Sequence, residues 1–515
     1  MRGKAPAKVF PMTRTSAHDL IDQVLDPGTF ISWDTPPHYG DISQDYKDAL
    51  ARAREKSGVD EAVITGEGEV FGHRVAFVLS EFGFLGGSIG AATARRIIDA
   101  IHKATELRLP LLISPSSGGT RMQEGSPAFA LMVSITTAVY RHKDAHLPFL
   151  VYLRNPTTGG VMASWGSAGH FTYAEPGSLL GFLGPRVVEL TTGKPIPEGV
   201  QSGENLADKG IIDGVISPTG LRKAVQKIVN VVLSPRCDEE PAAIDPAAAE
   251  AVTPESAWAA IEATRRMDRP GLQNLLAALG PDNVIALSGT GDGRKSPAIA
   301  VVIARLGGRP VVIIGQDRHN QPPHTDTEMG TSALRFARRG IMLAHSLQLP
   351  LVSIIDTTGA ELSQEAEESA MAGSIARTLG ELVDVDVPTV SVILGQGCGG
   401  GALAMLPADK VLASSNGWLS PLPPEGASAI IYRDTEHAPQ MMEEQSVAAQ
   451  ALLKAGIIDE IIPETVDAAD APEAFVDTVL NHITCSLWEL ENNPRRVGRE
   501  QRFRHYEKLA DHLTA

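Results

Sequence analysis

The sequence predicts an α/β protein made of two related domains in tandem. Short, wholly apolar runs such as LPLLIS at 109–114 and LPFLVYL at 147–153 alternate with Gly-rich turns and with segments of helical periodicity. The same order of runs and turns returns in the second half of the chain. The length of 515 residues is too great for one compact domain and fits two large ones.

The duplication keeps one register over a long stretch. An offset that places Leu349-Pro350 on Leu109-Pro110 also places Gly359 on Gly119. The same offset, without adjustment, aligns three further pairs: Pro388 with Pro148, Gly399-Gly400 with Gly159-Gly160, and Gly417 with Gly177. Because this period is far too long for a solenoid, we infer a duplicated domain.

The boundary between the halves is visible in the composition. After residue 236 the chain reads CDEEPAAIDPAAAEAVTPES, which is rich in Ala, Pro and acidic residues and has no amphipathic period. We therefore predict an N-terminal domain at 16–236, a linker at 237–256, a C-terminal domain at 257–492 and a charged tail at 493–515 that ends in a short helix.

Each half repeats a strand, a Gly-rich turn and a helix. In the first half the strand at 109–114 precedes a helical pattern at 125–142, and the strand at 147–153 precedes another at 159–170. A Rossmann fold is excluded, because Gly-Gly pairs replace the G-x-G-x-x-G fingerprint and no acidic residue follows at the expected distance. The second half offers corresponding buried strands: 350–356, 388–394 and 410–414.

Charge and composition exclude several classes of protein. With 45 basic and 62 acidic residues the net charge is −17, which argues against a nucleic-acid binder and a polybasic membrane anchor. No apolar run approaches the roughly 18 residues of a membrane span, and the N-terminus lacks the apolar core of a signal peptide. The three cysteines, Cys237, Cys398 and Cys485, lie too far apart for a disulfide framework or a zinc ribbon. These features predict a cytoplasmic protein.

Two glycine turns carry the strongest chemical signal. Gly159 and Gly160, and likewise Gly399, Gly400 and Gly401, follow a buried strand and precede a small-residue helix. Glycine lets a ligand approach the backbone closely, and N–H groups at a helix start face the positive end of its dipole. Such turns can form oxyanion holes. The alternative is that these glycines only allow a helix to pack closely against a strand.

Two further groups suit an anionic ligand. SSGGTRMQEG at 116–125 contains Gly118, Gly119 and Arg121 and is either a binding turn for a thioester or its phosphates or a solvated turn. The arginines of LRFARRG share one helical face and either hold a polyanionic tail such as that of coenzyme A or form a solvated surface. They are Arg335, Arg338 and Arg339.

Conventional acid–base catalysts are hard to assemble from this sequence. Neither G-x-S-x-G nor H-E-x-x-H is present. His319 and His324 lie in a polar, Pro-rich loop, where exposed histidines are common, and Cys398 is best explained as a small buried residue. A site rich in backbone donors but poor in bases suits an enolate reaction in which the reagent supplies its own base.

These motifs resemble a known family. EFGFLGGSIGAATARRI, PSSGGTRMQEGSPA and NPTTGGVMASWGSAGHFTYAEPGSLLGFLGPRVVE resemble the β part of bacterial acetyl-CoA carboxylase carboxyltransferase. LRFARRGIMLAHSLQLPLVSIIDTTGAE and GQGCGGGALAMLPADKVL resemble its α part. From about residue 16 to 463 the chain is therefore similar to a fused β–α carboxyltransferase subunit of biotin-dependent acyl-CoA carboxylases.

The resemblance implies two tandem crotonase-like (ClpP/crotonase) domains of ββα spiral units. It implies a homo-oligomer, a dimer or a dimer-based hexamer, because the family's active site lies between the N-domain of one protomer and the C-domain of another. Carboxybiotin on a separate biotin carrier protein releases CO₂, its ureido nitrogen takes the α-proton of acetyl-CoA or another short acyl-CoA, and the enolate attacks the CO₂. A biotin carboxylase is the further expected partner, and fatty acid biosynthesis the expected process.

The resemblance also assigns the site residues. Gly159 and Gly160 form one oxyanion hole and Gly399 to Gly401 the other, and which hole serves biotin stays open. The acyl-CoA path is assigned to five residues: Gly86, Gly87, Gly118, Gly119 and Arg121. This chain lacks the family's four-cysteine cluster, so no zinc or other metal is expected. Thr358 replaces the usual Pro, and the loop around His319 and His324 departs from the family, so the acyl specificity stays open.

Two other functions stay open at this point. A biotin-independent malonyl-thioester decarboxylase uses the same enolate and the same oxyanion holes. A non-catalytic subunit of a carboxylase complex keeps the fold without the chemistry, although the intact glycine pairs in both halves argue against it.

Overall fold

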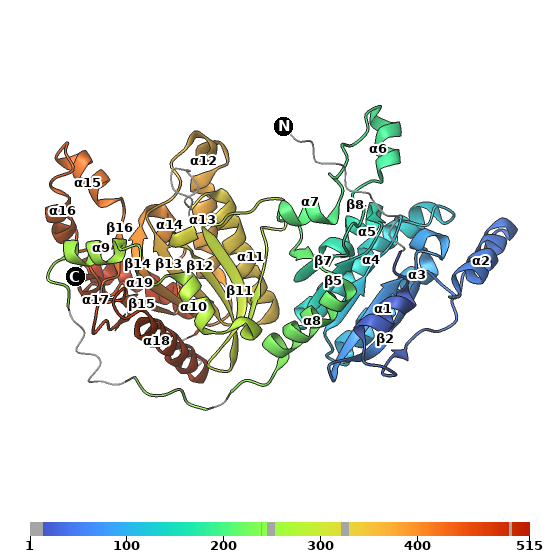
Figure 1. Ribbon diagram of the computed structural model, residues 1–515, viewed down its shortest axis with the longest axis horizontal. Helices are drawn as coiled ribbons and strands as arrows, with labels where there is room; N and C mark the ends of the chain where they lie inside the picture. The colour runs from blue at the N-terminus through green and yellow to red at the C-terminus, as the bar shows by residue number, and fades with distance from the viewer. Residues whose placement is uncertain (1–13, 238, 245–252, 321–328, 494–496, 515) are drawn as a thin grey trace, which may run out of the picture. The chain divides into compact units, whose positions relative to one another are not determined.

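The computed structural model forms two compact units, Met1–Gln226 and Lys227–Ala515 (Figure 1). Residues 227–236, which the sequence-based division places in the first domain, lie in the second unit, where Val229–Leu233 contacts its sheet. The domain boundaries inferred from the sequence stay predictions. The structure describes residues 14–237, 239–244, 253–320, 329–493 and 497–514.

The first unit is built on a seven-stranded sheet with the order β1-β2-β3-β4-β5-β7-β9. The first three strands pair antiparallel and the remaining neighbours pair parallel. A small sheet of β6 and β8 lies beside it. The strands are β1 Ile31–Ser32, β2 Val63–Val70, β3 His73–Ser80, β4 Leu111–Ser114, β5 Phe149–Leu153, β6 Thr157–Thr158, β7 Phe171–Ala174, β8 Leu180–Gly181 and β9 Gly214–Val215.

The second unit repeats this topology. Its main sheet has the order β10-β11-β12-β13-β14-β15-β17, again antiparallel at the first pairs and parallel afterwards, and β16 pairs with β14. The strands are β10 Val284–Ala286, β11 Ile299–Leu306, β12 Arg309–Gln316, β13 Leu351–Thr357, β14 Thr389–Cys398, β15 Lys410–Ser414, β16 Trp418–Ser420 and β17 Glu460–Ile462.

Helices connect the parallel strands in both units. The first unit contains α1 Ala17–Val24, α2 Gln44–Ser57, α3 Ala91–Glu106, α4 Gly125–Asp144, α5 Gly159–Met162, α6 Pro185–Thr192 and α7 Gly203–Asp208, and α8 Pro218–Ile228 leads into the second. The second contains α9 Ala257–Arg265, α10 Leu272–Ala278, α11 Thr331–Leu347, α12 Gln364–Glu368, α13 Met371–Asp384, α14 Gly399–Leu403, α15 Pro424–Ile431, α16 Ala438–Glu444, α17 Ala449–Lys454, α18 Pro472–Asn492 and α19 Arg499–Thr514. Of the helices described, none is long and apolar enough to cross a membrane.

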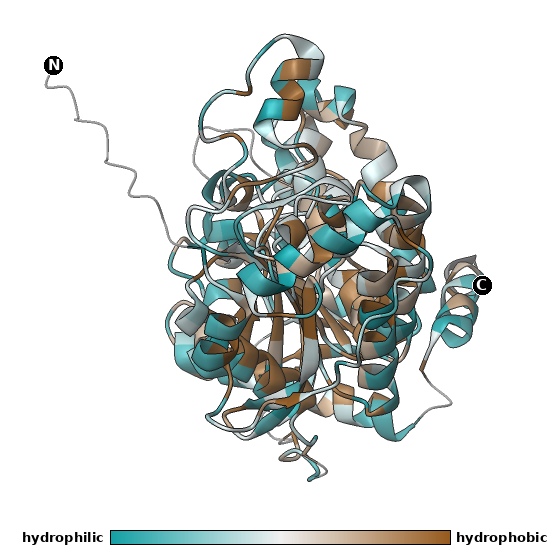
Figure 2. Cartoon of the chain, turned by 90° about the vertical axis from the view of Figure 1, so that its right-hand side faces the viewer, coloured by the Kyte–Doolittle hydropathy of each residue, from teal (hydrophilic) through white to brown (hydrophobic). Residues whose placement is uncertain are grey.

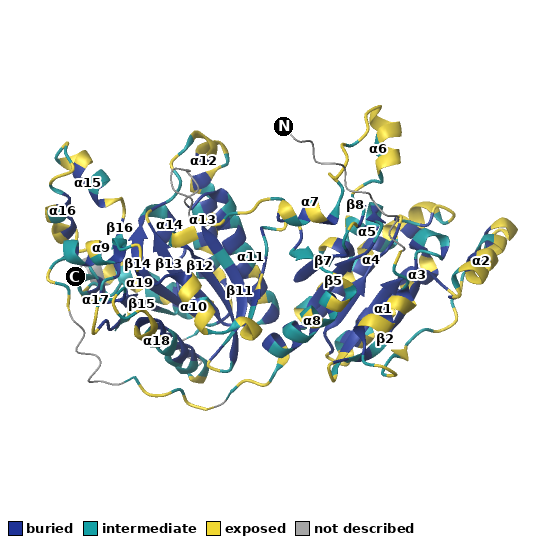
Figure 3. Cartoon of the chain, viewed as in Figure 1, coloured by how far each residue is buried: buried dark blue, intermediate teal, exposed yellow. Residues whose placement is uncertain are grey.

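The apolar runs form the two cores. Every residue of β5 and of β13 is buried, as expected for parallel strands covered by helices (Figure 3). Strands coloured hydrophobic lie between helices whose outer faces are hydrophilic (Figure 2). The predicted strands at 109–114, 147–153, 350–356, 388–394 and 410–414 are thus confirmed as β4, β5, β13, β14 and β15.

The duplication is visible in the strand register. Leu111 pairs with Phe149 in the first unit, and Leu351 pairs with Thr389 in the second, each shifted by the offset found in the sequence. On the other side of these strands, Ala76 pairs with Leu111 and Val312 with Leu351. By this register, the last residues of β3 and β12 occupy equivalent positions: Ser80 and Gln316.

Two helical predictions differ from the structure. The segment 159–170 contains only α5 and a single turn at Trp165–Ser167, because the Ser164 hydroxyl bonds the Gly160 carbonyl and Trp165 turns into the core. The tail is not a short helix but the long α19. Its Arg502 is buried, donates to the carbonyls of Leu382 and Val385, and forms an ion pair with Asp409.

Candidate active site

The first glycine turn lies between β5 and α5. Gly159 has φ 68°, a left-handed conformation that favours glycine, and its N–H donates to the Phe182 carbonyl over 2.8 Å. Gly160 follows in the first turn of α5, where an N–H group finds no acceptor within its own helix. Its N–H is therefore available to a ligand at the positive end of a short helix.

A second loop of the first unit contacts this turn. A Cβ at Gly159 would lie 3.2 Å from Gly119 Cα, so the two glycine backbones are in close approach. The Gly119 N–H donates to Ser117 Oγ over 3.0 Å, which fixes the loop but occupies that donor. Gly118 N–H in turn donates to the Gly86 carbonyl over 3.0 Å. The structure thus brings together the predicted glycines of three separate turns.

Gly87 explains why this third turn needs glycine. A Cβ there would lie 2.0 Å from the Ser116 carbonyl oxygen, a distance that no side chain tolerates. Gly86 and Gly87 both have positive φ, 67° and 62°. The turn Leu85–Gly87 is thereby pressed against the loop that carries Gly118.

Apolar side chains from α4 cover the open side of the first turn. A Cβ at Gly160 would meet Met132 Cγ at 3.5 Å, Thr120 Oγ1 at 3.5 Å and Phe129 Cε2 at 3.7 Å. These are ordinary contacts, so the methyl-sized space beside Gly160 is bounded by the Thr120 hydroxyl and by an apolar wall of two α4 side chains. Such a wall suits an acyl group, and a low local polarity strengthens hydrogen bonds to a developing negative charge.

The second unit repeats the turn. Gly399 begins α14 with φ 61°, and the Gly359 N–H donates to Thr357 Oγ1 over 3.2 Å, as Gly119 does to Ser117. A Cβ at Gly401 would lie 3.3 Å from the Ala360 nitrogen, so the same two segments are again in close approach. Gly400 and Gly401 stand in the first turn of α14, where N–H groups lack helical acceptors.

A buried polar network supports the second turn from below. Gln316 Nε2 donates to the Gly401 carbonyl over 2.8 Å, and Gln316 Oε1 accepts from the Asp356 N–H over 3.0 Å. Asp356 also accepts from the Gln396 N–H over 3.0 Å and pairs with Arg318 at 3.2 Å. One glutamine therefore ties β12 to both β13 and the glycine turn.

Arg121 is not a free cation in this structure. Its side chain is fully buried, and it forms an ion pair with Glu61 and donates to the Ser88 carbonyl. Burial favours the neutral form of both groups, but their mutual pairing outweighs it, so the pKa of Arg121 is raised and that of Glu61 lowered. Arg121 fixes the loop that follows Gly119, so any effect it has on a ligand is indirect.

The arginines of α11 line a separate cavity of about 480 Å³ in the second unit. Arg338 pairs with Glu381, with its Nε 2.8 Å from Oε1, and Arg339 donates to the Gly289 carbonyl over 3.0 Å. Asp292, Glu381 and Asp384 also line this cavity, so it lacks the excess positive charge that a polyanion requires.

The two histidines and the cysteine considered in the sequence analysis do not add a catalytic group to the glycine turns. His319 is exposed and packs beside Gly271, while His324 falls outside the described residues. Cys398 is buried directly before Gly399, as expected for a small packing residue. Among the residues that the structure describes, no group of three or more His, Cys, Asp or Glu side chains is arranged to hold a metal ion.

Sequence reasoning missed the groups that hold the turns in place. Ser117 and Thr357 stand at the duplication offset and each precedes its glycine by two residues, so this pair of hydroxyls was detectable. Gln316 was not, because its equivalent in the first unit is Ser80 and the sequence offset changes between β12 and α11.

Comparison with known proteins decides the family. The carboxyl transferase domain family matches residues 8–500. The chain belongs to this family. It is 51% identical over 496 residues to the probable biotin-dependent acyl-coenzyme A carboxylase beta3 subunit of Mycobacterium tuberculosis, covering 96% of this chain and 99% of that protein. It is 33% identical to the acetyl-coenzyme A carboxylase carboxyl transferase subunits beta/alpha of Salinispora arenicola, covering 96% and 91%.

Solved structures confirm the fold. The 12S transcarboxylase, a hexamer crystallised with methylmalonyl-coenzyme A, superposes with a TM-score of 0.69 at 19% identity, covering 92% of this chain and 90% of its own. A single-chain long-chain acyl-CoA carboxylase superposes with a TM-score of 0.67 at 18% identity, covering 90% of this chain and 46% of its own. Both are crotonase-fold carboxyltransferases, so the predicted crotonase-like fold is confirmed.

Proposed function

We propose that this carboxyltransferase is the transfer component of a biotin-dependent acyl-CoA carboxylase. It moves a carboxyl group from carboxybiotin, held on a biotin carrier protein, to the α-carbon of acetyl-CoA or another short acyl-CoA. The observation that carries the proposal is the repeated glycine turn, with Gly160 in one unit and Gly400 in the other presenting N–H groups at a helix start. Two oxygen atoms need stabilisation in this reaction, and the chain offers two sites for them.

At the first turn the chain stabilises negative charge on the thioester oxygen. The Gly160 N–H donates to that oxygen, and the bond strengthens as the enolate forms, so it lowers the barrier rather than only binding substrate. Met132 and Phe129 hold the acyl group against the turn and exclude water. The side chains nearest to Gly160 include no base, which fits a reaction in which the proton acceptor arrives with the other substrate.

At the second turn the chain holds the biotin ring. The fit is chemical: a ureido oxygen is a strong acceptor, and Gly400 and Gly401 lie in a helix start whose backbone Gln316 fixes from below. Bound carboxybiotin supplies the carboxyl group and the proton acceptor. The chain's own task there is to position the ureido oxygen and to polarise it through backbone N–H groups.

The assembly is a homo-oligomer in this proposal, a dimer or a dimer-based hexamer. Exposed apolar side chains next to the first turn support it: Phe129 and Val133 on α4 are 63% and 70% exposed, as expected for a surface covered by a second copy. The biotin carboxylase and the biotin carrier protein are the further partners. We place the reaction in the cytoplasm and in fatty acid biosynthesis, with no resident metal.

The reverse reaction tests this function. Purified protein is incubated with malonyl-CoA or methylmalonyl-CoA, with and without biocytin, and acyl-CoA release is measured. We expect release that depends on biocytin and is lost in Gly160→Ala. The new methyl group fits beside its neighbours, but it keeps the thioester oxygen from reaching the N–H. Release without biocytin would indicate the decarboxylase instead. Unchanged turnover of the intact complex in Gly160→Ala would indicate a non-catalytic subunit.

A further inference from the structure

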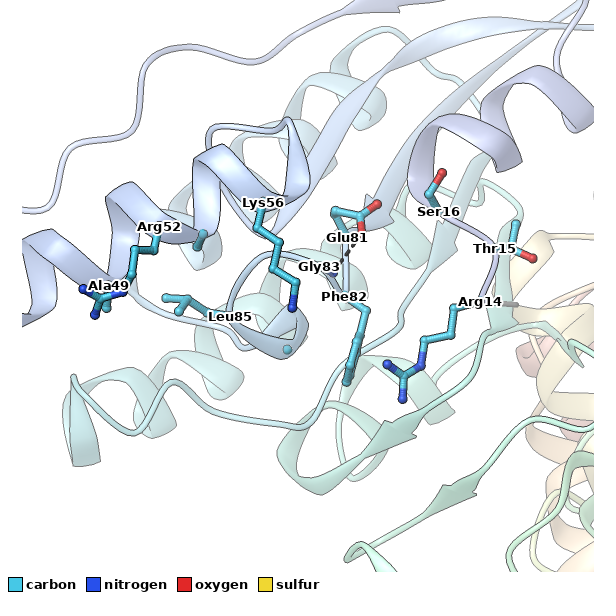
Figure 4. A pocket seen from close by; sticks show the side chains of 12 residues that line it. Arg14, Thr15, Ser16, Ala49, Arg52, Lys56, Glu81, Phe82, Gly83 and Leu85 are labelled. Atoms are coloured by element: carbon cyan, nitrogen blue, oxygen red, sulfur yellow. Dashed lines mark hydrogen bonds between the residues drawn. The ribbon is translucent and has the colours of Figure 1, made fainter. Parts of the chain in front are cut away.

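The two units carry a buried carboxylate at equivalent positions. By the strand register, Asp317 directly after β12 is equivalent to Glu81 directly after β3, and both side chains are buried. One carboxylate oxygen of Glu81 accepts from the Gly83 N–H over 2.8 Å, a bond drawn in Figure 4, and the other accepts from the Ala17 N–H over 2.9 Å. The first unit therefore satisfies both oxygens of its carboxylate with its own backbone.

Asp317 has only half of this bonding. Its Oδ2 atom accepts from Gln273 Nε2 over 2.6 Å. Its Oδ1 atom is buried and, within the described residues, has no hydrogen-bond partner. The side chain is 1% exposed, and a buried carboxylate oxygen without a donor is costly. We therefore expect a donor from outside the chain at this atom.

A cavity of about 340 Å³ in the second unit offers a place for such a donor. Asp317 lines it together with the loop between β10 and β11, the beginning of α10 and one side chain of α11. Three buried apolar side chains form part of its wall: Leu287, Ile299 and Phe336. A ligand that reaches Asp317 here can therefore also bury an apolar group.

A cation stands at the edge of the same cavity. Lys295 lines it from the β10–β11 loop and is exposed. Within the described residues Lys295 forms no hydrogen bond or ion pair, so it does not neutralise Asp317. Among the described residues that line the cavity, these two carry the only charged side chains. One acid and one base, with an apolar wall beside them, favour a ligand that itself carries both charges.

This cavity is separate from the second glycine turn. Among the described residues that line it, none belongs to that turn. Asp317 nevertheless follows Gln316, whose side chain donates to the Gly401 carbonyl. A ligand on Asp317 thus contacts the strand end that also supports the turn.

We propose that this cavity binds a small α-amino acid with an apolar side chain. The ammonium group donates to Asp317 Oδ1 in a charge-assisted hydrogen bond, the carboxylate faces Lys295, and the side chain packs against the apolar wall. The ligand thereby supplies the second donor that Glu81 obtains from its own chain. The site goes beyond carboxyl transfer and does not depend on it.

Calorimetric titration of the full-length protein with L-phenylalanine and with L-leucine tests this site. Asp317→Asn keeps the shape of the side chain and removes its charge. Asp282→Asn makes the same change at an exposed aspartate that does not line the cavity. For the amino acid that binds more tightly, we expect Kd to rise about tenfold or more in Asp317→Asn and to stay within about twofold in Asp282→Asn.

Analogues of phenylalanine separate the two ends of the ligand. 3-Phenylpropionate, which lacks the ammonium group, should bind at least about tenfold more weakly than L-phenylalanine. Phenethylamine lacks the carboxylate, so Lys295→Gln should weaken binding of L-phenylalanine about threefold and leave that of phenethylamine unchanged. The exposed position of Lys295 makes this variant a test that does not perturb the core.

Three results would overturn the proposal. Equal affinity in the wild type and Asp317→Asn would show that the carboxylate does not hold the ligand. Tight binding of 3-phenylpropionate would exclude the ammonium contact. No binding of either amino acid at millimolar concentration would mean that water alone satisfies Asp317 Oδ1. None of these measurements uses carboxyl transfer, so each result leaves the proposed function as it stands.

Discussion

The glycine turns of the two units share their backbone and differ in the groups beneath it. Ser117 and Thr357 accept from the equivalent glycines, and Gly159 and Gly399 adopt the same left-handed conformation. In the first unit the guanidinium of Arg154 lies beneath the strand ends and donates to the carbonyls of Ser80, Ser114 and Thr15. In the second unit Leu394 stands at the position of Arg154, and Gln316 with its polar partners takes over.

This difference distinguishes the residues that the reaction requires from the residues that could change between the two units. The first two positions of each turn have kept glycine in both halves, because a side chain there would block the approach of a ligand or strain the backbone. Positions that only hold the turn have diverged, from the buried Arg154 in the first unit to the buried Gln316 with the Asp356–Arg318 ion pair in the second. The feature that both units share is therefore the geometry of the N–H donors, and different residues hold that geometry in each unit.

The largest expected effect comes from the turn glycines themselves. Gly159→Ala and Gly399→Ala should each lower kcat for carboxyl transfer by about 10²–10³-fold, because a side chain at these positive-φ positions strains the turn and misplaces the N–H donors of Gly160 and Gly400 that follow. Gly72→Ala is the matched control, because Gly72 also has positive φ, 78°, but stands in the β2–β3 hairpin with open space around it. It should lose about 1 kcal/mol of stability and no activity. A large loss of kcat in only one of the two variants would show that the two turns do not contribute equally to catalysis.

Lowering the pH should destabilise the first unit through a buried histidine that the second unit lacks at the equivalent position. His142 is buried in α4, and burial lowers its pKa to about 4 from 6.5, while the offset position holds Leu382. Between these pH values the unfolded chain binds a proton that the folded chain does not. The free energy of unfolding therefore falls as pH drops through this window, by about 3 kcal/mol at pH 4.

Urea denaturation from pH 7 to pH 4 measures this difference. In His142→Leu, which copies the second unit, the fall in unfolding free energy should be smaller by that amount. Other groups contribute equally to both proteins, so the comparison isolates one histidine. An identical pH dependence in the variant would show that His142 titrates normally.

Substituting the equivalent residues Gln316 and Ser80 should change the stability of the protein by different amounts. Gln316→Met leaves the Gly401 carbonyl and the Asp356 N–H without partners, and such buried groups cost about 1–3 kcal/mol. Ser80→Ala, at the equivalent position, should change stability by less than about 0.5 kcal/mol, because in the described structure the Ser80 hydroxyl has no hydrogen-bond partner. Calorimetric unfolding checks both variants, and kcat should fall in Gln316→Met alone.

The sequence predicted the architecture from features that are local or repeated. Apolar runs predicted β4 and β13, and the constant offset alone related Gly159 to Gly399. What it did not predict depends on contacts between distant segments. The pairing of Arg121 with Glu61 joins residues 60 positions apart and turns a presumed ligand contact into a buried support.

The same limit applies to the site. That the Gly86 and Gly118 turns touch could be expected only from the resemblance, because helix α3 and strand β4 separate the two turns along the chain. Gln316 carried no signal, since a single amide at a strand end looks like any surface residue in sequence. Its role follows from burial and from two hydrogen bonds that the fold creates.

The smallest expected effect tests the shared hydroxyl beneath each turn. Ser117→Ala and Thr357→Ala each leave one glycine N–H without its acceptor, and each should lose about 1 kcal/mol of stability. Thr357→Ser keeps the hydroxyl and should behave like the wild type in both unfolding and turnover. Because the two turns use the same bond, the two alanine variants should match within about 0.5 kcal/mol. A clear inequality would mean that the hydroxyls, like Arg154 and Gln316, belong to the supports that each half has evolved separately.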